Sequence, residues 1–264
     1  MVLGLSAVLL AAPARADDDP WIMIRRDLFA DRPIAENDAT LAIEAPEKAE
    51  DSALVPISVH IFSKIAPRVK TLTLVIDHNP APVVGTFTFG SAAGSSSRIL
   101  STRVRFDSFS YLRAVIETED GELHMTSAFV KAAGGCSATA LKDAEEAAAH
   151  LGEVRIKHMA TAPVFKSNAD EKPTGEAQVM IRHPNNSGMQ LDAATGKYIA
   201  ARFVTELDVK RGDDLVFHLE AGIALSSNPN FQFTYESAGS VPLSVTAKDT
   251  DGATFNGRSL PPSS

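Results

Sequence analysis

The chain has one cysteine, Cys136, which lies near the middle of its 264 residues in the segment Ala-Ala-Gly-Gly-Cys-Ser. A thiolate is a nucleophile that can hold a covalent cargo. Gly134 and Gly135 precede the thiol, and glycine provides a loose, unobstructed backbone because it has no Cβ. No bulky apolar residue stands beside the sulfur, so we expect an exposed, functional thiol on a flexible neck. The alternative is a buried, inert cysteine, since free cysteine is among the most buried residue types.

A run of strong helix formers follows the cysteine, from Thr139 to Leu151, and Gly152 would end it. The N-terminus of a helix presents unpaired N–H groups and partial positive charge, which favour an anion. The sequence therefore predicts a lowered pKa for the Cys136 thiol. The same helix is expected to link two domains.

The seven histidines are scattered and lack the spacing of a metal site. They are His60, His78, His124, His150, His158, His183 and His218. His60 and His218 lie within strand patterns, where a structural role is expected, and His183 precedes a proline in a loop. A thiol enzyme with His150 or His183 as the base is a further alternative. No cofactor or metal is expected.

Composition narrows the class of protein. Hydrophobic residues make up 44% and charged residues 22%, as in a folded soluble domain, and the formal net charge is −8. No basic stripe accompanies that negative charge, which argues against a nucleic-acid partner because phosphate binding needs clustered Lys and Arg.

The first residues resemble a secretory signal. Val2–Ala12 is apolar, and Ala14-x-Ala16 fits the small-residue rule for cleavage, so residues 1–16 are expected to be a signal peptide. A membrane anchor is the alternative, but this run is shorter than the roughly 20 apolar residues that span a bilayer. Export to an oxidising compartment with one cysteine indicates either a free reactive thiol or an intermolecular disulfide dimer through Cys136.

Short alternating segments dominate the rest of the chain. After a lead-in over residues 17–39, about seven predicted strands fill residues 40–133, and Asp120-Gly121 is a strong hairpin signal. The carrier segment and linker helix occupy residues 134–152, and the β pattern returns over residues 153–264. The pattern therefore predicts an all-β protein with two β-sandwiches joined by a short linker helix.

Short motifs follow one another along the first half: Ile34-Ala35-Glu36-Asn37, Ala53-Leu54-Val55-Pro56-Ile57-Ser58-Val59, Asp77-His78-Asn79-Pro80-Ala81-Pro82, Leu100-Ser101-Thr102-Arg103-Val104-Arg105 and Gly134-Gly135-Cys136. In this order they resemble the SoxY family of bacterial sulfur-oxidation proteins. The second half contains Ile181-Arg182-His183-Pro184, Ser187-Gly188, Asp192, Gly196, Gly222-Ile223-Ala224, Ser227-Asn228-Pro229 and Asp249-Thr250-Asp251-Gly252-Ala253. In this order these motifs resemble the SoxZ family.

The resemblance implies two immunoglobulin-like sandwiches and a covalent carrier role for Cys136, with Gly134 and Gly135 as its flexible neck. In SoxY the cysteine lies at the extreme C-terminus, whereas here a second domain follows it, so the thiol is tethered at both ends. Fused carriers of this kind also resemble proteins associated with quinoprotein dehydrogenase systems.

Together these features predict a periplasmic, non-enzymatic carrier that holds a sulfur-containing intermediate on Cys136. Its expected partners are periplasmic enzymes of sulfur oxidation or of a quinoprotein dehydrogenase pathway, and cytochromes. The rival hypothesis is an adaptor or chaperone-like protein for a quinoprotein dehydrogenase or cytochrome, in which Cys136 is incidental.

Overall fold

The computed structural model describes residues 19–30, 32–37, 39–138, 149–159, 174–237 and 239–260. The expected signal peptide and most of the expected linker helix, residues 139–148, lie outside the described residues. The described residues before Arg32 and those from Arg32 onward form two compact units, and every strand of the described residues lies in the second.

The first unit contains one helix, α1 (Pro20–Phe29), within the expected lead-in. Asp19 caps it, since its carboxylate accepts a hydrogen bond from the Trp21 N–H at 3.1 Å, and Pro20 suits the first helical position. Trp21 and Phe29 lie two turns apart, and their ring centroids are 6.4 Å from each other. No helix in the described ranges is long and apolar enough to cross a membrane.

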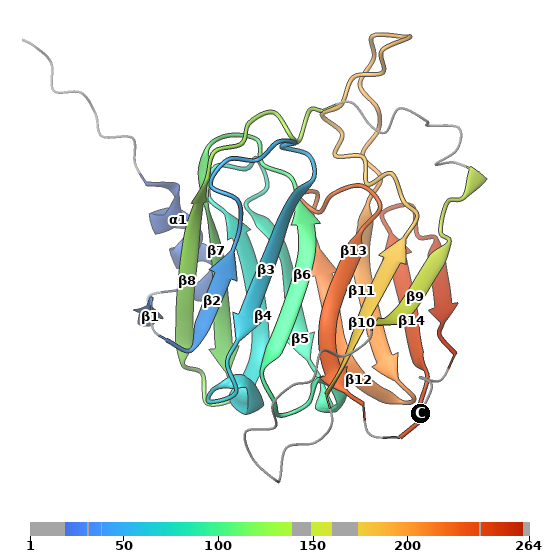
Figure 1. The fold of residues 1–264 in the computed structure, drawn as a ribbon. Helices are drawn as coiled ribbons and strands as arrows, with labels where there is room; N and C mark the ends of the chain where they lie inside the picture. Colours follow the sequence, from blue (N-terminus) through green and yellow to red (C-terminus); the bar gives the residue numbers. More distant parts are fainter. Residues whose placement is uncertain are drawn as a thin grey trace, which may run out of the picture. The chain divides into compact units, whose positions relative to one another are not determined.

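The second unit is built from strands, which confirms the all-β fold class (Figure 1). The strands of the first half are β1 (Ile34–Glu36), β2 (Leu41–Glu44), β3 (Val55–Ile61), β4 (Val69–Ile76), β5 (Val83–Phe89), β6 (Arg98–Val104), β7 (Ser110–Thr118) and β8 (Leu123–Val130). Those of the second half are β9 (Val154–Met159), β10 (Thr174–Ile181), β11 (Val204–Arg211), β12 (Asp214–Ala221), β13 (Asn230–Glu236), β14 (Leu243–Asp249) and β15 (Thr254–Arg258).

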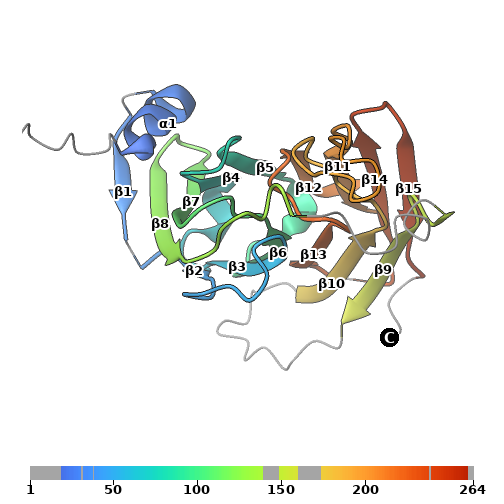
Figure 2. The ribbon, with the colours of Figure 1, turned by 90° about the horizontal axis from the view of Figure 1, so that it is seen from above.

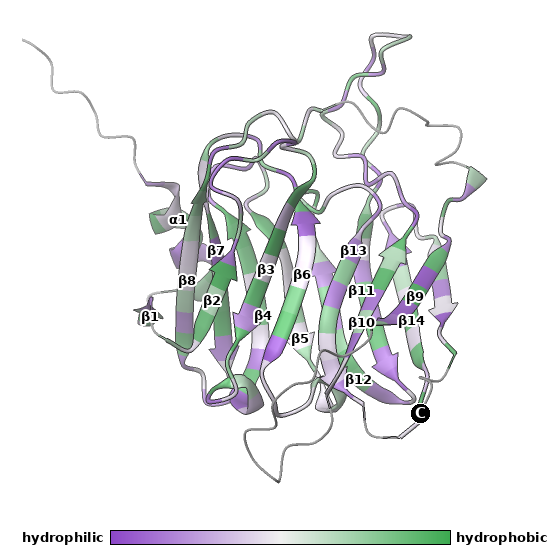
Figure 3. Cartoon of the chain, viewed as in Figure 1, coloured by the Kyte–Doolittle hydropathy of each residue, from purple (hydrophilic) through white to green (hydrophobic). Residues whose placement is uncertain are grey.

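Two sheets pack as two layers, and each sheet contains strands of both halves (Figure 2). The larger sheet has nine strands in the order β1-β8-β7-β4-β5-β12-β11-β14-β15, and the smaller has six in the order β2-β3-β6-β13-β10-β9. Strand periodicity explains the layers, because burial alternates along β3 and β10 as it must when one face meets the core. Figure 3 shows this mixture of hydrophobic and hydrophilic positions along the strands.

The two halves meet edge to edge in both sheets. β5 pairs with β12 from Phe89↔Phe217 to Gly85↔Ala221, and β6 pairs with β13 through Leu100↔Phe233. One hydrophobic core runs through this seam, where the Phe87 ring lies 5.6 Å from that of Phe217. The halves are therefore more closely joined than two sandwiches connected only by a linker.

Candidate functional site

The Gly-Gly-Cys segment does not project from the protein but lies along a neighbouring loop. After β8 the chain pairs with residues 47–49, where the Lys131 N–H donates to the Glu47 carbonyl at 2.8 Å. Further on, the Gly134 N–H donates to the Asp107 carbonyl at 2.8 Å and the Gly135 N–H to the Phe106 carbonyl at 2.7 Å. We call residues 131–138 the cysteine arm and this arrangement its docked state.

The two glycines make the docked state possible in different ways. Gly134 has φ +78°, a conformation that costs other residues energy, although a side chain there would meet nothing within 4 Å. Gly135 is packed so closely that a Cβ would come within 2.0 Å of the Ser52 carbonyl oxygen and 2.7 Å of that of Phe106. Gly135 therefore permits close approach of two backbones, and Gly134 permits the turn.

A loop of the second half holds the arm from the other side. The Ser187 hydroxyl donates to the carbonyl oxygen of Cys136 at 2.6 Å. The Ser187 N–H donates to Gln190 Oε1 at 2.8 Å, so the serine is itself fixed, and both side chains are buried. The arm is thus held by backbone groups of the first half, through Gly134 and Gly135, and by a side chain of the second half, through the carbonyl of Cys136.

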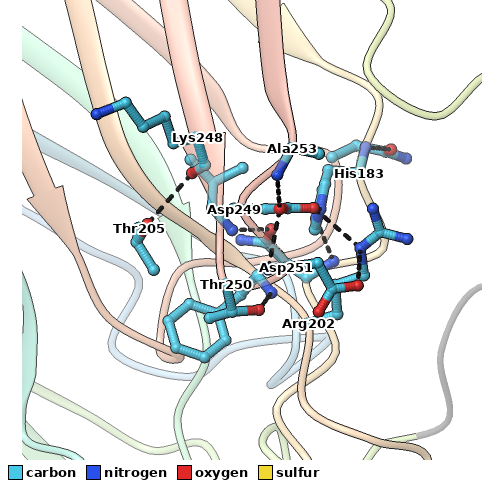
Figure 4. A network of polar contacts seen from close by, with 12 residues as sticks. His183, Arg202, Thr205, Lys248, Asp249, Thr250, Asp251 and Ala253 are labelled. Atoms are coloured by element: carbon cyan, nitrogen blue, oxygen red, sulfur yellow. Dashed lines mark hydrogen bonds and ion pairs between the residues drawn. The ribbon is translucent and has the colours of Figure 1, made fainter.

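The loop that carries Ser187 is anchored by a buried polar network (Figure 4). The Asn185 N–H donates to His183 Nδ1 at 3.0 Å, so the imidazole proton is on Nε2, which faces Asp249 Oδ2 at 3.4 Å. Arg202 bridges Asp249 and Asp251, with both contacts at 2.9 Å. Burial lowers the pKa of His183 although Asp249 opposes the shift, so the ring is neutral. This network orients the loop rather than the thiol.

The structure contradicts the expected exposure of the thiol. Cys136 is 1% exposed, because the glycines let the arm lie flush against the 105–107 loop while the second half covers it. The prediction of a lowered pKa is also wrong: burial, aided by the Asp107 carboxylate, raises the pKa of Cys136 from 9.0 to about 11. In the docked state the sulfur is therefore a protonated, unreactive thiol.

One positive charge opposes this shift. Arg105, on the loop against which the arm docks, lowers the pKa of Cys136 but is outweighed by burial and Asp107. The Arg105 side chain is 2% exposed, and its Nε and Nη1 have no hydrogen-bond partner among the described residues. Sequence reasoning included Arg105 only as part of a family motif, and its position at the end of a strand pattern did not indicate that it would be buried beside the thiol.

No histidine among the described residues makes a hydrogen bond or ion pair with Cys136. His183 is committed to the network above, and His150 is exposed beside Glu153 at 3.5 Å. His218 contacts Asp208 at 2.7 Å, and His60 lies 3.4 Å from Ser58. In the described ranges no group of three His, Cys, Asp or Glu side chains is placed to hold a metal ion. Among the described residues, no histidine is therefore placed to act as a base for Cys136.

Comparison with known proteins divides the chain at the arm. Residues 25–136 match the family model of the sulfur oxidation protein SoxY, and residues 165–259 match that of the sulphur oxidation protein SoxZ. No curated protein matches the chain. A solved structure of the sulfur carrier protein SoxY from Chlorobium limicola f thiosulfatophilum is 26% identical, covering 41% of this chain and 88% of that one, with a TM-score of 0.34.

Proposed function

We propose that this chain, which carries a SoxY domain and a SoxZ domain in tandem, is a periplasmic carrier. It bonds a sulfur-containing intermediate to Cys136 and presents that intermediate to partner enzymes. The observation that supports this most is that the SoxY match ends at residue 136, on the thiol itself. That thiol is carried by a glycine neck on an arm held by both domains. Gly134 and Gly135 act as the neck.

The carrier chemistry follows from the state of the thiol. Attaching thiosulfate to Cys136 forms one S–S bond, releases the thiol proton and passes two electrons to a redox partner such as a cytochrome. The docked thiol is protonated and buried, so loading and unloading need an undocked arm. The proposal assigns both steps to partner enzymes, since no histidine in the described part of the chain contacts the thiol.

The location and partners in this proposal come from other features. The apolar run Val2–Ala12 and the cleavage pattern Ala14-x-Ala16 support export to the periplasm. The fusion of both domains in one chain supports partners from a quinoprotein dehydrogenase pathway as well as from sulfur oxidation.

Intact-protein mass spectrometry tests the carrier function most directly. The protein would be isolated without reductant from the periplasm of cells grown on a reduced sulfur substrate. We expect reductant-sensitive, sulfur-bearing adducts on Cys136, whereas a plain free thiol under these conditions would contradict the proposal.

The burial of Cys136 and its raised pKa favour one other function, that of an adaptor in which the cysteine is incidental. Cys136→Ser separates the two. A carrier loses all pathway activity with this substitution, whereas an adaptor keeps its binding and most of its activity.

A further inference from the structure

Arg105 differs from the other buried arginines of the described residues. Arg98 donates to the carbonyls of Val69 and Gly94 at 3.0 and 2.9 Å, and Arg113 forms a bidentate pair with Asp77 at 2.7–2.9 Å. Arg98 Nε also lacks a partner, but both of its terminal nitrogens are bonded, whereas Arg105 leaves Nε and Nη1 without a partner among the described residues. Burying polar groups of a cation without hydrogen bonds is costly, and such an exception in a folded protein calls for an explanation.

The backbone holds Arg105 firmly at the arm. Its N–H donates to the Ala224 carbonyl at 2.7 Å, and its carbonyl accepts from Asn79 Nδ2 at 2.7 Å. The next residue, Phe106, accepts the hydrogen bond of Gly135. The Arg105 backbone is therefore bonded to both halves beside the docked arm, and its guanidinium lies within electrostatic range of Cys136.

This proposal rests on the proposed carrier function: we propose that Arg105 is a specificity-determining residue, which binds the negatively charged sulfonate end of the adduct on Cys136. A planar guanidinium with free N–H groups matches two oxygens of a sulfonate, as it does those of a carboxylate. The free thiol is neutral and leaves this cation unsatisfied, whereas a sulfonate end supplies both the charge and the acceptors.

Two carboxylates set the limits of this preference. Asp51 and Asp107 lie within electrostatic range of Arg105 and of Cys136, respectively, and each disfavours an anion. The binding must therefore come from direct hydrogen bonds to the guanidinium rather than from a generally positive surface. A cationic adduct gains nothing from Arg105 and is repelled by it.

Chemical labelling of the purified full-length chain tests the proposal. Methanethiosulfonate reagents react with the Cys136 thiolate to form a mixed disulfide, and methanesulfinate leaves. One batch receives the anionic sulfonatoethyl group and another the cationic trimethylammonioethyl group. The rate at which neutral dithiothreitol removes each label is then measured in the folded protein and in the same protein unfolded in urea.

The measured quantity is the ratio of the removal rate of the cationic label to that of the anionic label. We expect this ratio to be at least about tenfold larger in the folded protein than in urea. Arg105→Met should abolish this difference and Arg105→Lys should restore part of it. An equal ratio in folded and unfolded protein would overturn the proposal even if Arg105→Met fails to fold. So would a ratio unchanged in a folded Arg105→Met variant.

This outcome is independent of the carrier test, because the label is installed chemically. Absence of native adducts on Cys136 would remove the carrier function without changing the label ratio. Native adducts with no anion preference would keep the carrier and remove only the role of Arg105.

Discussion

At the scale of single residues, the thiol is protected by its position. Burial and Asp107 keep Cys136 protonated, and a protonated thiol is a poor nucleophile. An arm that buries its sulfur when docked and lets it ionise when released would keep the thiol unreactive until release.

The pH dependence of Cys136 follows from its raised pKa. The docked state favours the neutral thiol, so this contribution to docking is complete below pH 9 and is lost as the pH rises through about 11. We expect the rate of alkylation by iodoacetamide to keep rising between pH 9 and 11. The same reaction on urea-unfolded protein is the control, and a plateau of the folded protein near pH 9 would contradict the expectation.

The adjacent glycines provide a matched pair of substitutions. Gly135→Ala places a Cβ against the Ser52 carbonyl and should undock the arm, raising alkylation of Cys136 at pH 8 by about a hundredfold or more. Gly134→Ala meets open space and suffers only the cost of positive φ, about 1–2 kcal/mol, so its effect should be about tenfold. A Gly135→Ala variant with the wild-type rate would show that the docked state does not control reactivity.

At the scale of elements, two segments far apart in the chain form one site. The cysteine arm supplies the thiol, and the loop of residues 183–190 supplies Ser187, which is fixed by Gln190 and by the network around Asp249. The strength of this contact should decide how often the arm is released.

Removing the Ser187 hydroxyl tests that contact. Ser187→Ala deletes one hydrogen bond to the docked arm, worth about 1 kcal/mol, and alkylation of Cys136 should rise roughly fivefold. Ser137→Ala is the matched control, because its exposed hydroxyl bonds only Gly134 within the arm itself. Equal rates for the two variants would argue against a holding role for the second half.

At the scale of the whole chain, the β-rich halves share their sheets and their core. Gly85 of β5 lies where β5 meets β12, and a Cβ there would come within 2.8 Å of the Glu220 carbonyl oxygen. The seam is therefore a tightly packed interior and not a contact between independent modules.

Such a seam predicts one cooperative thermal transition for both halves in calorimetry, because neither half can lose its edge strand without exposing the common core. Gly85→Val should lower the stability of that single transition by about 1–3 kcal/mol through overpacking. The expectation that both halves unfold as one unit would be contradicted by two separate transitions in the unaltered protein. It would also be contradicted if Gly85→Val destabilised only one half.

The sequence alone determined the fold class, the strands and the thiol. Alternation with period two, as in Val55–Ile61, identified the strands because one face of each must be apolar. The dipeptide Asp120-Gly121 identified a hairpin because such turns need a residue that tolerates positive φ, and Gly121 does take φ +83° in the structure. Cys136 was identified because it is the only cysteine in the sequence and follows two glycines. The short β1 was missed, since three residues carry no periodicity.

Only the tertiary structure decided how the site works. Pairing of β5 with β12 and of β6 with β13 brings Ser187 to an arm 51 residues earlier in the chain, and no local pattern records that contact. The same packing buries Cys136 beside Arg105 and Asp107, which reverses the expected exposure and the expected pKa shift. Desolvation depends on what covers a group from elsewhere in the chain, and a single sequence does not contain that information in its local composition.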